Sequence, residues 1–457
     1  MPEPREGVNA DRAPARPATF RAARGAMRGV KLRDLPSVLE IPTRGAIDAV
    51  LRVPGSKSIT NRALLVAALA SGESQLSGGL ESDDTLAMIE GLTALGCEIT
   101  LGPERWRVQG RRGKLQRSAA AIQARSSGTT ARFLTAAAAL ANGTVVIDGS
   151  PRMRERPIAD LTDALQRLGV RVDVLGQQGC PPVRVHGGAL PGGRAEIDAR
   201  RSSQFVSAVL LTAPYARADV VLEFTGGVLV SKPYVDLTLQ VMRAFGAEAE
   251  WIGPAALRVK AGRGYRGREY AIEPDASAAV YPFCAAAISG GRARVEDIPA
   301  DSIQADVKVL GVLEAMGCEL RRGADFAEVR GPVGRLRGVD VDMNEMPDAA
   351  LAIAVVALFA GGPTQLRNIA NLRIKETDRL RALETELRKL GAGASTTEDA
   401  LVIEPGRLHG AEIETYDDHR MAMSFALAGL RIPGVSIRDP ACVRKTWPEY
   451  FEMLERL

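Results

Sequence analysis

A pattern that recurs at nearly constant spacing is the strongest constraint that this sequence places on its fold. Five times, an amphipathic helical stretch ends in a hydrophobic residue followed by glycine, with 71 to 77 residues from one glycine to the next. Glycine suits this position because the backbone dihedral φ turns positive after a helix. The five pairs are Leu95-Gly96, Leu168-Gly169, Phe245-Gly246, Met316-Gly317 and Leu390-Gly391. A sixth copy would end at Leu457, so six similar units are predicted.

A second set of helices is predicted between these stretches, each beginning in a polar cluster and continuing into an alanine-rich segment. Their expected starts are 70 to 75 residues apart, at Lys57, Gly128, Ser203, Asp275, Asp348 and Asp418. Each unit is predicted to consist of helix, strand, amphipathic helix, glycine and further strands. Such units are too large for a solenoid, and six are too few for a TIM barrel. We therefore predict an α/β fold of three plus three units, with the alanine-rich helices buried and the amphipathic helices outside.

Length and composition predict a globular protein of two or three domains. The 457 residues carry 59 Lys and Arg against 55 Asp and Glu, a nearly balanced net charge of +4. This balance argues against a nucleic-acid coat but permits a local basic cleft. The longest apolar run, residues 349–361, is too short to span a membrane. Residues 1–38 are rich in Arg, Ala and Pro without helical periodicity, which predicts a disordered N-terminal extension.

Cysteine and histidine usage bears on the compartment and on metal binding. Only three histidines occur, and the five cysteines form no CxxC pair: Cys97, Cys180, Cys284, Cys318 and Cys442. This pattern predicts a reduced, cytoplasmic protein without structural disulfides, a Cys-type zinc site or a His-rich metal site.

Basic residues gather at the predicted helix starts, where acidic residues would be electrostatically favoured. Eight of them lie at or within two turns of a predicted N-terminus: Lys57, Arg62, Arg132, Arg156, Lys375, Arg379, Arg420 and Lys445. Any one of them could be an ordinary solvated surface charge. Eight at equivalent places in the repeat favour a second interpretation, in which helix dipoles and cations face one cleft. The predicted ligand is a small molecule with several negative charges.

Three carboxylates and one histidine lie within this basic set. Asp348 opens a nearly all-apolar helix and can cap it, but a capping carboxylate that faces a cationic cleft can also act as a general base. Glu376, flanked by cations, belongs either to a surface ion pair or to the cleft. Asp275 stands at another helix start. His419 could carry protons or belong to the polar cap of its helix, and we favour the cap.

Two glycine-containing motifs are rejected because of their surroundings. Gly262-Arg263-Gly264-Tyr265-Arg266-Gly267 matches GxGxxG, but strand-like residues rather than a helix follow it, so a β-turn is predicted. Gly55-Ser56-Lys57-Ser58 lacks the glycines of a P-loop, which excludes a Walker-type ATPase. Instead, Ser56 or Ser58 is expected to cap the helix that begins at Lys57.

Several stretches are long and specific enough to be compared with known families. They are Pro54-Gly55-Ser56-Lys57-Ser58-Ile59-Thr60-Asn61-Arg62-Ala63-Leu64, Arg156-Pro157-Ile158, Leu229-Val230-Ser231-Lys232-Pro233-Tyr234, Leu372-Arg373-Ile374-Lys375-Glu376-Thr377-Asp378-Arg379 and Asp418-His419-Arg420-Met421-Ala422-Met423. From about residue 40 to the C-terminus, the chain resembles the 5-enolpyruvylshikimate-3-phosphate (EPSP) synthase family. The resemblance implies two inside-out α/β domains, each of three repeated βα units, with the active site in the interdomain cleft. The first domain would comprise 39–54 plus 273–457 and the second 55–272, with crossings near Pro54–Ser56 and Ile272–Asp275.

The resemblance also implies a reaction, in which the enolpyruvyl group of phosphoenolpyruvate is transferred to the 5-hydroxyl of shikimate-3-phosphate and phosphate is released, within aromatic amino-acid biosynthesis. It implies a cytoplasmic, monomeric transferase without metal or cofactor, which binds neither nucleic acid nor membrane. Shikimate-3-phosphate would contact Lys57, Ser58, Arg62, Ser202, Ser203, Gln204, Ser231, Tyr234, Asp348, Asn371 and Lys375. Phosphoenolpyruvate would contact Lys57, Gly128, Arg156, Gln204, Arg379, Arg420 and Lys445. Asp348 would take the proton of the 5-hydroxyl, and Glu376, with Lys57, would handle the proton at the methylene carbon.

One stretch departs from the family pattern. The family has a proline where this chain has Phe133, within Ser126-Ser127-Gly128-Thr129-Thr130-Ala131-Arg132-Phe133. A proline would fix φ and stiffen the segment that holds Gly128 beside the enolpyruvyl site, whereas Phe133 must find apolar packing for a large ring. Glyphosate, the family's inhibitor, is longer than phosphoenolpyruvate, so weaker glyphosate inhibition is predicted here than in a variant with proline.

Two other functions are weighed against this one. The UDP-N-acetylglucosamine enolpyruvyl transferase shares the fold but typically carries a reactive cysteine in a mobile loop. Cys97 and Cys318 instead follow cap glycines, where burial at a strand start is expected. A non-catalytic anion-binding protein would be expected to lack Asp348, Glu376 or Lys57, and all three are present.

Overall fold

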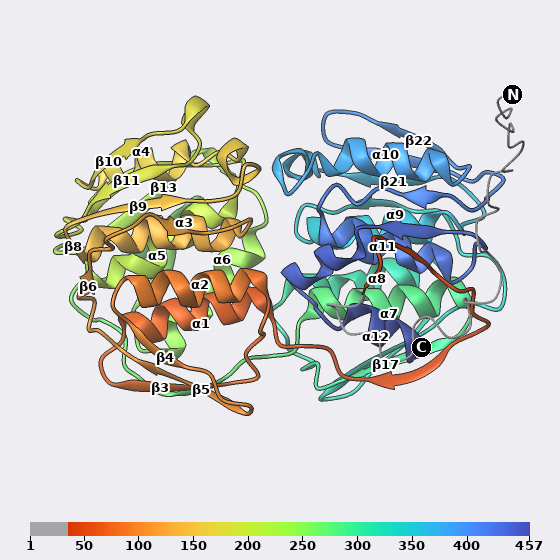
Figure 1. The fold of residues 1–457 in the computed structure, drawn as a ribbon, viewed down its shortest axis with the longest axis horizontal. Coiled ribbons are helices and arrows are strands. Elements are labelled where there is room, and N and C mark those ends of the chain that lie inside the picture. Colours follow the sequence, from red (N-terminus) through yellow and green to blue (C-terminus); the bar gives the residue numbers. More distant parts are fainter. Residues whose placement is uncertain (1–34) are drawn as a thin grey trace, which may run out of the picture.

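The computed structural model describes residues 35–457, which form two halves that lie side by side (Figure 1). Residues 57–244 supply the helices of one half and residues 276–455 those of the other. The buried apolar side chains form two clusters, one between Ile59 and Ile272 and one that combines residues 39–53 with residues 278–454. The division into two domains at Pro54 and Ile272 stays a prediction, which these separate clusters support.

The half on the left of Figure 1 repeats one succession of elements three times. The first unit contains α1 (Lys57–Leu69), β3 (Glu73–Ser77), α2 (Asp83–Ala94), β4 (Glu98–Thr100) and β5 (Arg105–Gln109). The second contains β7 (Ile122–Gln123), α3 (Gly128–Ala137), β9 (Thr144–Asp148), α4 (Ala159–Arg167), β10 (Arg171–Val174) and β11 (Val183–His186). The third contains β12 (Gly193–Ala199), α5 (Ser203–Thr212), β13 (Val220–Leu229), α6 (Lys232–Ala244), β14 (Ala249–Gly253) and β15 (Ala256–Val259), and β16 (Glu269–Ala271) follows. A separate pair is formed by β6 (Leu115–Gln116) and β8 (Ala141–Asn142).

The other half begins with β1 (Val38–Glu40) and β2 (Asp48–Leu51) and repeats the succession three more times. Its first unit contains α7 (Ala276–Ser289), β17 (Arg292–Glu296), α8 (Val309–Ala315), β18 (Glu319–Arg322) and β19 (Phe326–Arg330). The next contains β20 (Asp340–Asp342), α9 (Ala350–Ala357), β21 (Thr364–Arg367), α10 (Arg379–Lys389), β22 (Gly393–Thr396) and β23 (Leu401–Glu404). The last contains β24 (Glu412–Ile413), α11 (His419–Gly429), β25 (Ser436–Arg438) and α12 (Tyr450–Glu455). The predicted six-fold repeat is confirmed.

Each unit has a small sheet of mixed strand directions. In the sheet β16-β3-β5-β4, β3 runs parallel to β16 and antiparallel to β5, and β5 is antiparallel to β4. The same plan recurs in β7-β9-β11-β10, β12-β13-β15-β14, β2-β17-β19-β18 and β20-β21-β23-β22, and with three strands in β24-β25-β1. The fold is therefore a mixed α/β fold made of many small sheets.

Helix burial and the helix ends follow the predicted pattern. All residues of α1 from Ile59 onward and all of α9 are buried, whereas the buried leucines of α10 recur with helical spacing. The alanine-rich helices thus form the interior. The cap glycines Gly96, Gly169, Gly246, Gly317 and Gly391 have φ of 85°, 86°, 93°, 107° and 92°, as a left-handed helix end requires. The GxGxxG stretch also behaves as predicted, with a turn at Gly262 and the strand β16 after it.

The chain passes twice between the halves, and the two passages lie next to each other. Ser56 N donates a hydrogen bond to Glu273 O at 2.8 Å, and Asp275 N donates one to Pro54 O at 2.7 Å. The strands before the passages are exchanged, since β2 precedes α1 but pairs with β17, and β16 precedes α7 but pairs with β3. Each half therefore begins its first sheet with a strand from a distant part of the chain.

Of the predicted disordered N-terminal extension, residues 1–38, the part up to position 34 lies outside the described residues. Its last residue, Val38, pairs with Arg438 between β1 and β25, and Ser37 O accepts a hydrogen bond from Asp439 N. The predicted end of the disordered extension is therefore wrong at Val38, which is already the first residue of the strand β1. Within residues 35–457, no helix is long and apolar enough to cross a membrane.

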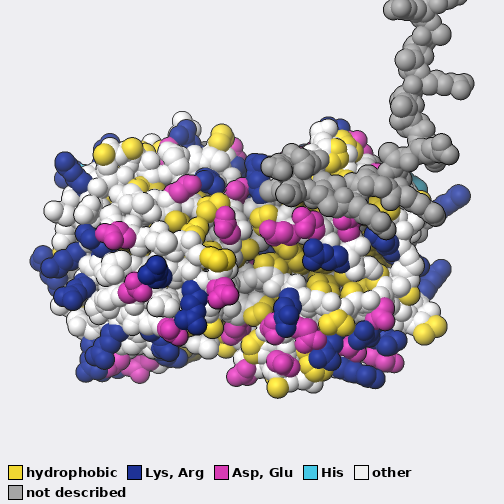
Figure 2. Space-filling model, turned by 60° about the horizontal axis from the view of Figure 1, so that its bottom comes forward, with side chains coloured by type: hydrophobic (Ala, Val, Ile, Leu, Met, Phe, Trp, Pro, Cys, Tyr) yellow, Lys and Arg dark blue, Asp and Glu magenta, His cyan; other side chains and the backbone are white. Residues whose placement is uncertain are grey.

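Charged side chains of both signs are mixed on the face of the molecule in Figure 2, where Lys and Arg lie among Asp and Glu. Exposed pairs such as Arg105 with Glu269 are of the kind that contributes only about 0–1 kcal/mol to stability. The cations of the predicted cleft belong to a different class, because six of the eight are buried and Lys57 and Lys375 are only partly exposed.

Candidate active site

One cavity is lined by residues from the helix starts of both halves. The starts of α1, α5 and α6 contribute from one half, and short turns at Pro347–Ala349 and Ala370–Ile374 contribute from the other. All eleven residues predicted to contact shikimate-3-phosphate line this cavity: Lys57, Ser58, Arg62, Ser202, Ser203, Gln204, Ser231, Tyr234, Asp348, Asn371 and Lys375. Thr129, Arg201, Val230 and Pro347 complete its wall. The repeat therefore brings together residues that are more than 300 positions apart.

Asp275 caps two helices at once. Its Oδ1 accepts a hydrogen bond from Ser277 N at 2.8 Å at the start of α7, and its Oδ2 accepts one from Lys57 N at 3.1 Å at the start of α1. The prediction that Ser56 or Ser58 caps α1 is wrong, because this carboxylate takes the place of a serine cap. Ser56 Oγ is buried without a hydrogen-bond partner among the described residues. The first residue of α1 is thus held by the neighbouring passage of the chain.

Asp348 lies among three cations. Its Oδ1 is 3.0 Å from Arg379 Nη1 and 3.6 Å from Lys375 Nζ, and its Oδ2 is 3.1 Å from Arg420 Nη2. Burial favours the neutral acid, but Arg420, Lys375 and Arg379 together hold the pKa of Asp348 well below its usual value. Asp348 is therefore ionised at neutral pH, as a proton acceptor must be.

Arg379 connects three carboxylates, and its side chain is 1% exposed. Besides Asp348, it contacts Asp418 through Nε at 2.7 Å and Nη2 at 3.1 Å, and Glu376 Oε2 through Nη2 at 2.9 Å. Glu376 is only 11% exposed, so its interpretation as a surface ion pair is wrong. Burial opposes its ionisation, but Arg379, Arg156 and Lys445 hold the pKa of Glu376 well below its usual value.

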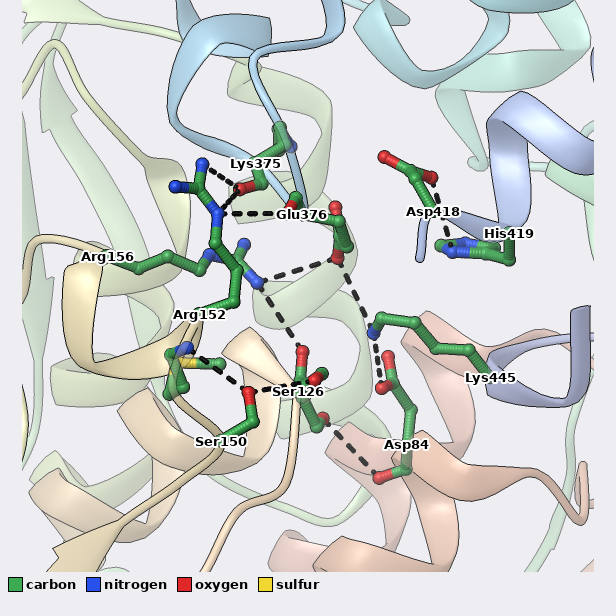
Figure 3. Close-up of polar contacts among 12 residues, drawn as sticks. Asp84, Ser126, Ser150, Arg152, Arg156, Lys375, Glu376, Asp418, His419 and Lys445 are labelled. Carbon is green, nitrogen blue, oxygen red and sulfur yellow. Dashed lines mark hydrogen bonds and ion pairs between the residues drawn. The ribbon is translucent and has the colours of Figure 1, made fainter. Parts of the chain in front are cut away.

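Figure 3 shows how these contacts continue into the other half. Glu376 Oε1 lies 3.5 Å from Arg156 Nη1 and 3.4 Å from Lys445 Nζ. Lys445 Nζ is 2.5 Å from Asp84 Oδ1, and Lys57 Nζ is 3.3 Å from Asp84 Oδ2. The ion-pair network thus joins six cations to four carboxylates across both halves. Its surplus of positive charge favours an anionic ligand.

The residues predicted to bind phosphoenolpyruvate lie on this network or next to it. Gly128 is the first residue of α3, and a Cβ there would lie 2.3 Å from Arg132 Nη1 and 2.9 Å from Arg156 Nη2. Gln204 accepts a hydrogen bond from Arg132 Nη1 at 3.0 Å. Glycine at position 128 therefore lets two guanidinium groups approach the helix start closely.

Phe133 packs against a residue that lines the cavity. Its ring is fully buried in α3, and the Arg62 guanidinium carbon lies over it, 5.3 Å from the ring centroid. Arg62 also donates hydrogen bonds to Thr238 Oγ1 at 2.8 Å and to Ser58 O at 2.9 Å. The Phe133 ring is thus packed in the interior, as the sequence analysis expected, with Arg62 over its face.

His419 begins α11 and is fully buried. Neither ring nitrogen has a hydrogen-bond partner among the described residues. Burial, together with Lys445 and Arg420, holds the pKa of His419 well below its usual value, so the ring is neutral at neutral pH. The helix is capped by Asp418, which accepts a hydrogen bond from Arg420 N at 2.9 Å.

Two residues of this site were missed as site residues by the sequence analysis. Asp84, near the start of α2, bridges two of the predicted lysines. Arg152 donates hydrogen bonds to the main-chain oxygens of Lys375 and Glu376, both at 2.9 Å, and so links the halves. Both lie at helix starts in the repeat, so equivalence between units was the signal that could have found them.

The cysteines lie outside this site, and no metal-binding group is found among the described residues. Cys97 and Cys318 are buried where β4 and β18 begin, as predicted, and burial raises the pKa of each thiol to about 12. Within residues 35–457, no three His, Cys, Asp or Glu side chains are grouped so that they could hold a metal ion.

Comparison with known proteins agrees with this geometry. The family model described as EPSP synthase (3-phosphoshikimate 1-carboxyvinyltransferase) matches residues 41–454. A 3-phosphoshikimate 1-carboxyvinyltransferase from Nostoc punctiforme is 45% identical over 92% of this chain and 99% of its own, and one from Yersinia pestis is 47% identical over 90% and 96%.

Solved structures agree as well. EPSP synthase from Acinetobacter baumannii superimposes with a TM-score of 0.76 at 26% identity, covering 92% of this chain and 97% of that one. The enolpyruvyl transferase NikO from Streptomyces tendae, at 20% identity and a TM-score of 0.73 over 92% and 96% of the two chains, shares the fold. The family model over residues 41–454 and the relatives at 45% and 47% identity show that the chain belongs to the EPSP synthase (3-phosphoshikimate 1-carboxyvinyltransferase) family.

Proposed function

We propose that the chain transfers the enolpyruvyl group of phosphoenolpyruvate to the 5-hydroxyl of shikimate-3-phosphate and releases phosphate. The observation that carries this proposal is the cavity lined by all eleven residues expected to contact shikimate-3-phosphate, with the buried ion-pair network beside it. The cavity lies between the two halves, which supports two inside-out domains with the active site in their cleft. Because every proposed site residue comes from one chain, a monomer suffices.

The two substrates are proposed to occupy neighbouring parts of the cleft. Shikimate-3-phosphate would bind the hydroxyls at the start of α5 and the side chains of Lys375 and Asn371. The anionic groups of phosphoenolpyruvate would bind Arg156 and Lys445. These two cations now contact Glu376, and the incoming anion would compete with that carboxylate. Binding would thus weaken the contacts that keep Glu376 ionised and raise its pKa.

The chemistry then needs removal of the 5-hydroxyl proton and two opposite proton transfers at the methylene carbon of phosphoenolpyruvate. The oxygen at position 5 bonds to carbon 2 of phosphoenolpyruvate while the methylene carbon gains a proton. Phosphate later leaves with its bonding electron pair as that carbon loses a proton, which restores the double bond. Asp348 is proposed to accept the hydroxyl proton, and Glu376, with Lys57, to deliver and remove the proton at the methylene carbon. The preorganised cations would stabilise the charge that develops on the intermediate.

A phosphate-release assay tests this function. Phosphate is expected only when shikimate-3-phosphate and phosphoenolpyruvate are both present. UDP-N-acetylglucosamine in place of shikimate-3-phosphate is expected to give none. Phosphate release from phosphoenolpyruvate with UDP-N-acetylglucosamine but not with shikimate-3-phosphate would contradict the proposal. It would favour the UDP-N-acetylglucosamine enolpyruvyl transferase instead.

Shikimate-3-phosphate alone is expected to compact the protein and to lower the dissociation constant of phosphoenolpyruvate. The halves meet through polar contacts near the site, such as Arg444 with Asp83 at 3.0 Å, and an anion that neutralises the surplus positive charge of the network between them would favour the closed arrangement. Small-angle scattering of the empty and liganded protein measures the change. Shikimate, which lacks the phosphate, is the control ligand. Identical scattering curves with and without shikimate-3-phosphate would contradict the expected closure of the two halves.

Phe133→Pro is expected to lower the inhibition constant of glyphosate, with little change in the KM for phosphoenolpyruvate. The proline would stiffen α3 behind Gly128 and remove the ring beneath Arg62. Phe133 lies inside α3, where proline costs about 3 kcal/mol, so thermal unfolding of the variant must be measured as well. Phe133→Leu, which removes the ring but keeps the helix, is the matched control. An unchanged glyphosate constant in the proline variant means that the ring is core packing only.

A further inference from the structure

Asp306 is a buried carboxylate close to the cavity that the proposed reaction does not use. It lies in the short helical turn Ala305–Lys308 and is 2% exposed. The preceding residues fasten this turn to the second passage between the halves. Ser302 Oγ and Gln304 Nε2 donate hydrogen bonds to Glu273 Oε2 at 2.8 and 3.0 Å, and Gln304 Nε2 also donates one to Pro274 O at 2.7 Å. Asp306 is therefore placed rigidly at the point where the chain changes halves.

The partners of Asp306 come from both halves. Tyr234 Oη, from the start of α6, donates a hydrogen bond to Asp306 Oδ2 at 3.1 Å. Ser277 Oγ, from the start of α7, donates another to the same oxygen. The second oxygen, Oδ1, is buried without a hydrogen-bond partner among residues 35–457. Tyr234 lines the cavity, whereas Asp306 lies behind it.

Stability does not explain a carboxylate in this position. Burial raises the pKa of Asp306 to about 6, while Arg420 lowers it and Asp348 and Asp275 raise it. Its hydrogen-bonded partners are hydroxyl groups rather than a cation. A buried carboxylate without a paired cation is costly, and perturbed carboxylates cluster at functional sites.

We propose that Asp306 is a positioning residue for shikimate-3-phosphate, because it holds the Tyr234 hydroxyl in the cavity wall when the two halves are closed. The inference rests on the proposed function, in which Tyr234 contacts that substrate. The hydrogen bond spans the halves, so it forms on closure and is lost on opening. Asp306 therefore couples the orientation of a substrate-binding hydroxyl to the closed arrangement.

A double-mutant cycle tests this role. Tyr234→Phe and Asp306→Ala are each expected to raise the KM for shikimate-3-phosphate about tenfold, as loss of one hydrogen bond to a charged group would. The double variant is expected to be no worse than either single variant, because both remove the same contact. The KM for phosphoenolpyruvate is expected not to rise. Asp306→Asn, whose amide oxygen can still accept from Tyr234, should restore most of the affinity, and Asp301→Ala, an exposed aspartate of the same loop, is the control.

The outcomes separate this role from others. Multiplying effects in the double variant, or no change in Asp306→Ala, would overturn the inference. A parallel rise in both KM values with a lower unfolding temperature, not rescued by Asp306→Asn, would assign Asp306 to folding and overturn it as well. If Asp306→Ala does not fold, Asp306→Leu, which is similar in size and cannot accept a hydrogen bond, takes its place in the cycle and is judged by the same outcomes. Absence of wild-type turnover with shikimate-3-phosphate would overturn the proposed function, and this inference with it.

Discussion

Lys57→Met is expected to lower kcat by about 10³-fold while the fold stays intact, because removal of one preorganised charge typically costs 10²–10³-fold in rate and Lys57 is proposed to act in proton transfer as well. Lys57 is the first residue of α1, and its side chain is 15% exposed. It lines the substrate cavity and contacts Asp84, so it can act on both substrates. Methionine keeps the length and the apolar stem of the side chain.

Steady-state kinetics and thermal unfolding of the variant provide the measurement. Lys114→Met, at an exposed lysine outside the cavity, is the matched control and is expected to keep full activity. Wild-type kcat in Lys57→Met would remove this lysine from the mechanism. A fall in kcat that accompanies a large loss of stability would instead mean that the pair with Asp84 is structural.

Asp348→Ala is expected to lose most of kcat, by about 10²–10⁴-fold as general-base catalysis contributes, with only a modest rise in the KM for shikimate-3-phosphate. The variant leaves Arg379, Arg420 and Lys375 without this carboxylate. Their freed positive charge should hold phosphoenolpyruvate at least as well as before, so its KM is expected not to rise. Asp348→Asn should behave alike, because an amide cannot take the proton.

The two KM values and kcat, measured in both variants, check this prediction. Asp325→Ala, at an exposed turn between β18 and β19, is the matched control. A change confined to KM would mean that Asp348 binds substrate and that another group is the base. Arg420, Lys375 and Arg379 hold the pKa of Asp348 low, and bound anions that neutralise these cations would raise it toward the range of an effective base, so kcat is measured with both substrates at saturation.

The parts of the fold that sequence analysis predicted are those set by local chemistry. A glycine after each amphipathic helix is required by the positive φ of the helix end, and all five predicted glycines have it. Alanine-rich segments could be assigned to the interior because they have no polar face to expose. Because the same pattern recurs in each unit, cations at equivalent helix starts could be assigned to one cleft, although any one of them alone could have been a surface charge.

What the sequence could not predict depends on partners distant along the chain. The cap of α1 comes from Asp275, 218 residues away, while the hydroxyl of the adjacent Ser56 has no hydrogen-bond partner within residues 35–457. Asp84 and Asp306 each contact a residue of the other half, and the residues next to them in the sequence do not indicate those partners. Such contacts arise from how the halves meet, which local patterns do not encode.

The pairing of β1 and β2 with strands of the half that is made last has a consequence for the order in which the chain folds during synthesis. All elements from α1 to β16 are complete once residue 272 has left the ribosome, so this middle part can fold while the remainder is still being made. By contrast, β1 is the first strand made within residues 35–457, but its partner β25 spans Ser436–Arg438, close to the C-terminal residue Leu457. β1 can therefore pair with β25 only when translation is almost complete. At three residues, it is short enough to present little unpaired edge to other chains meanwhile.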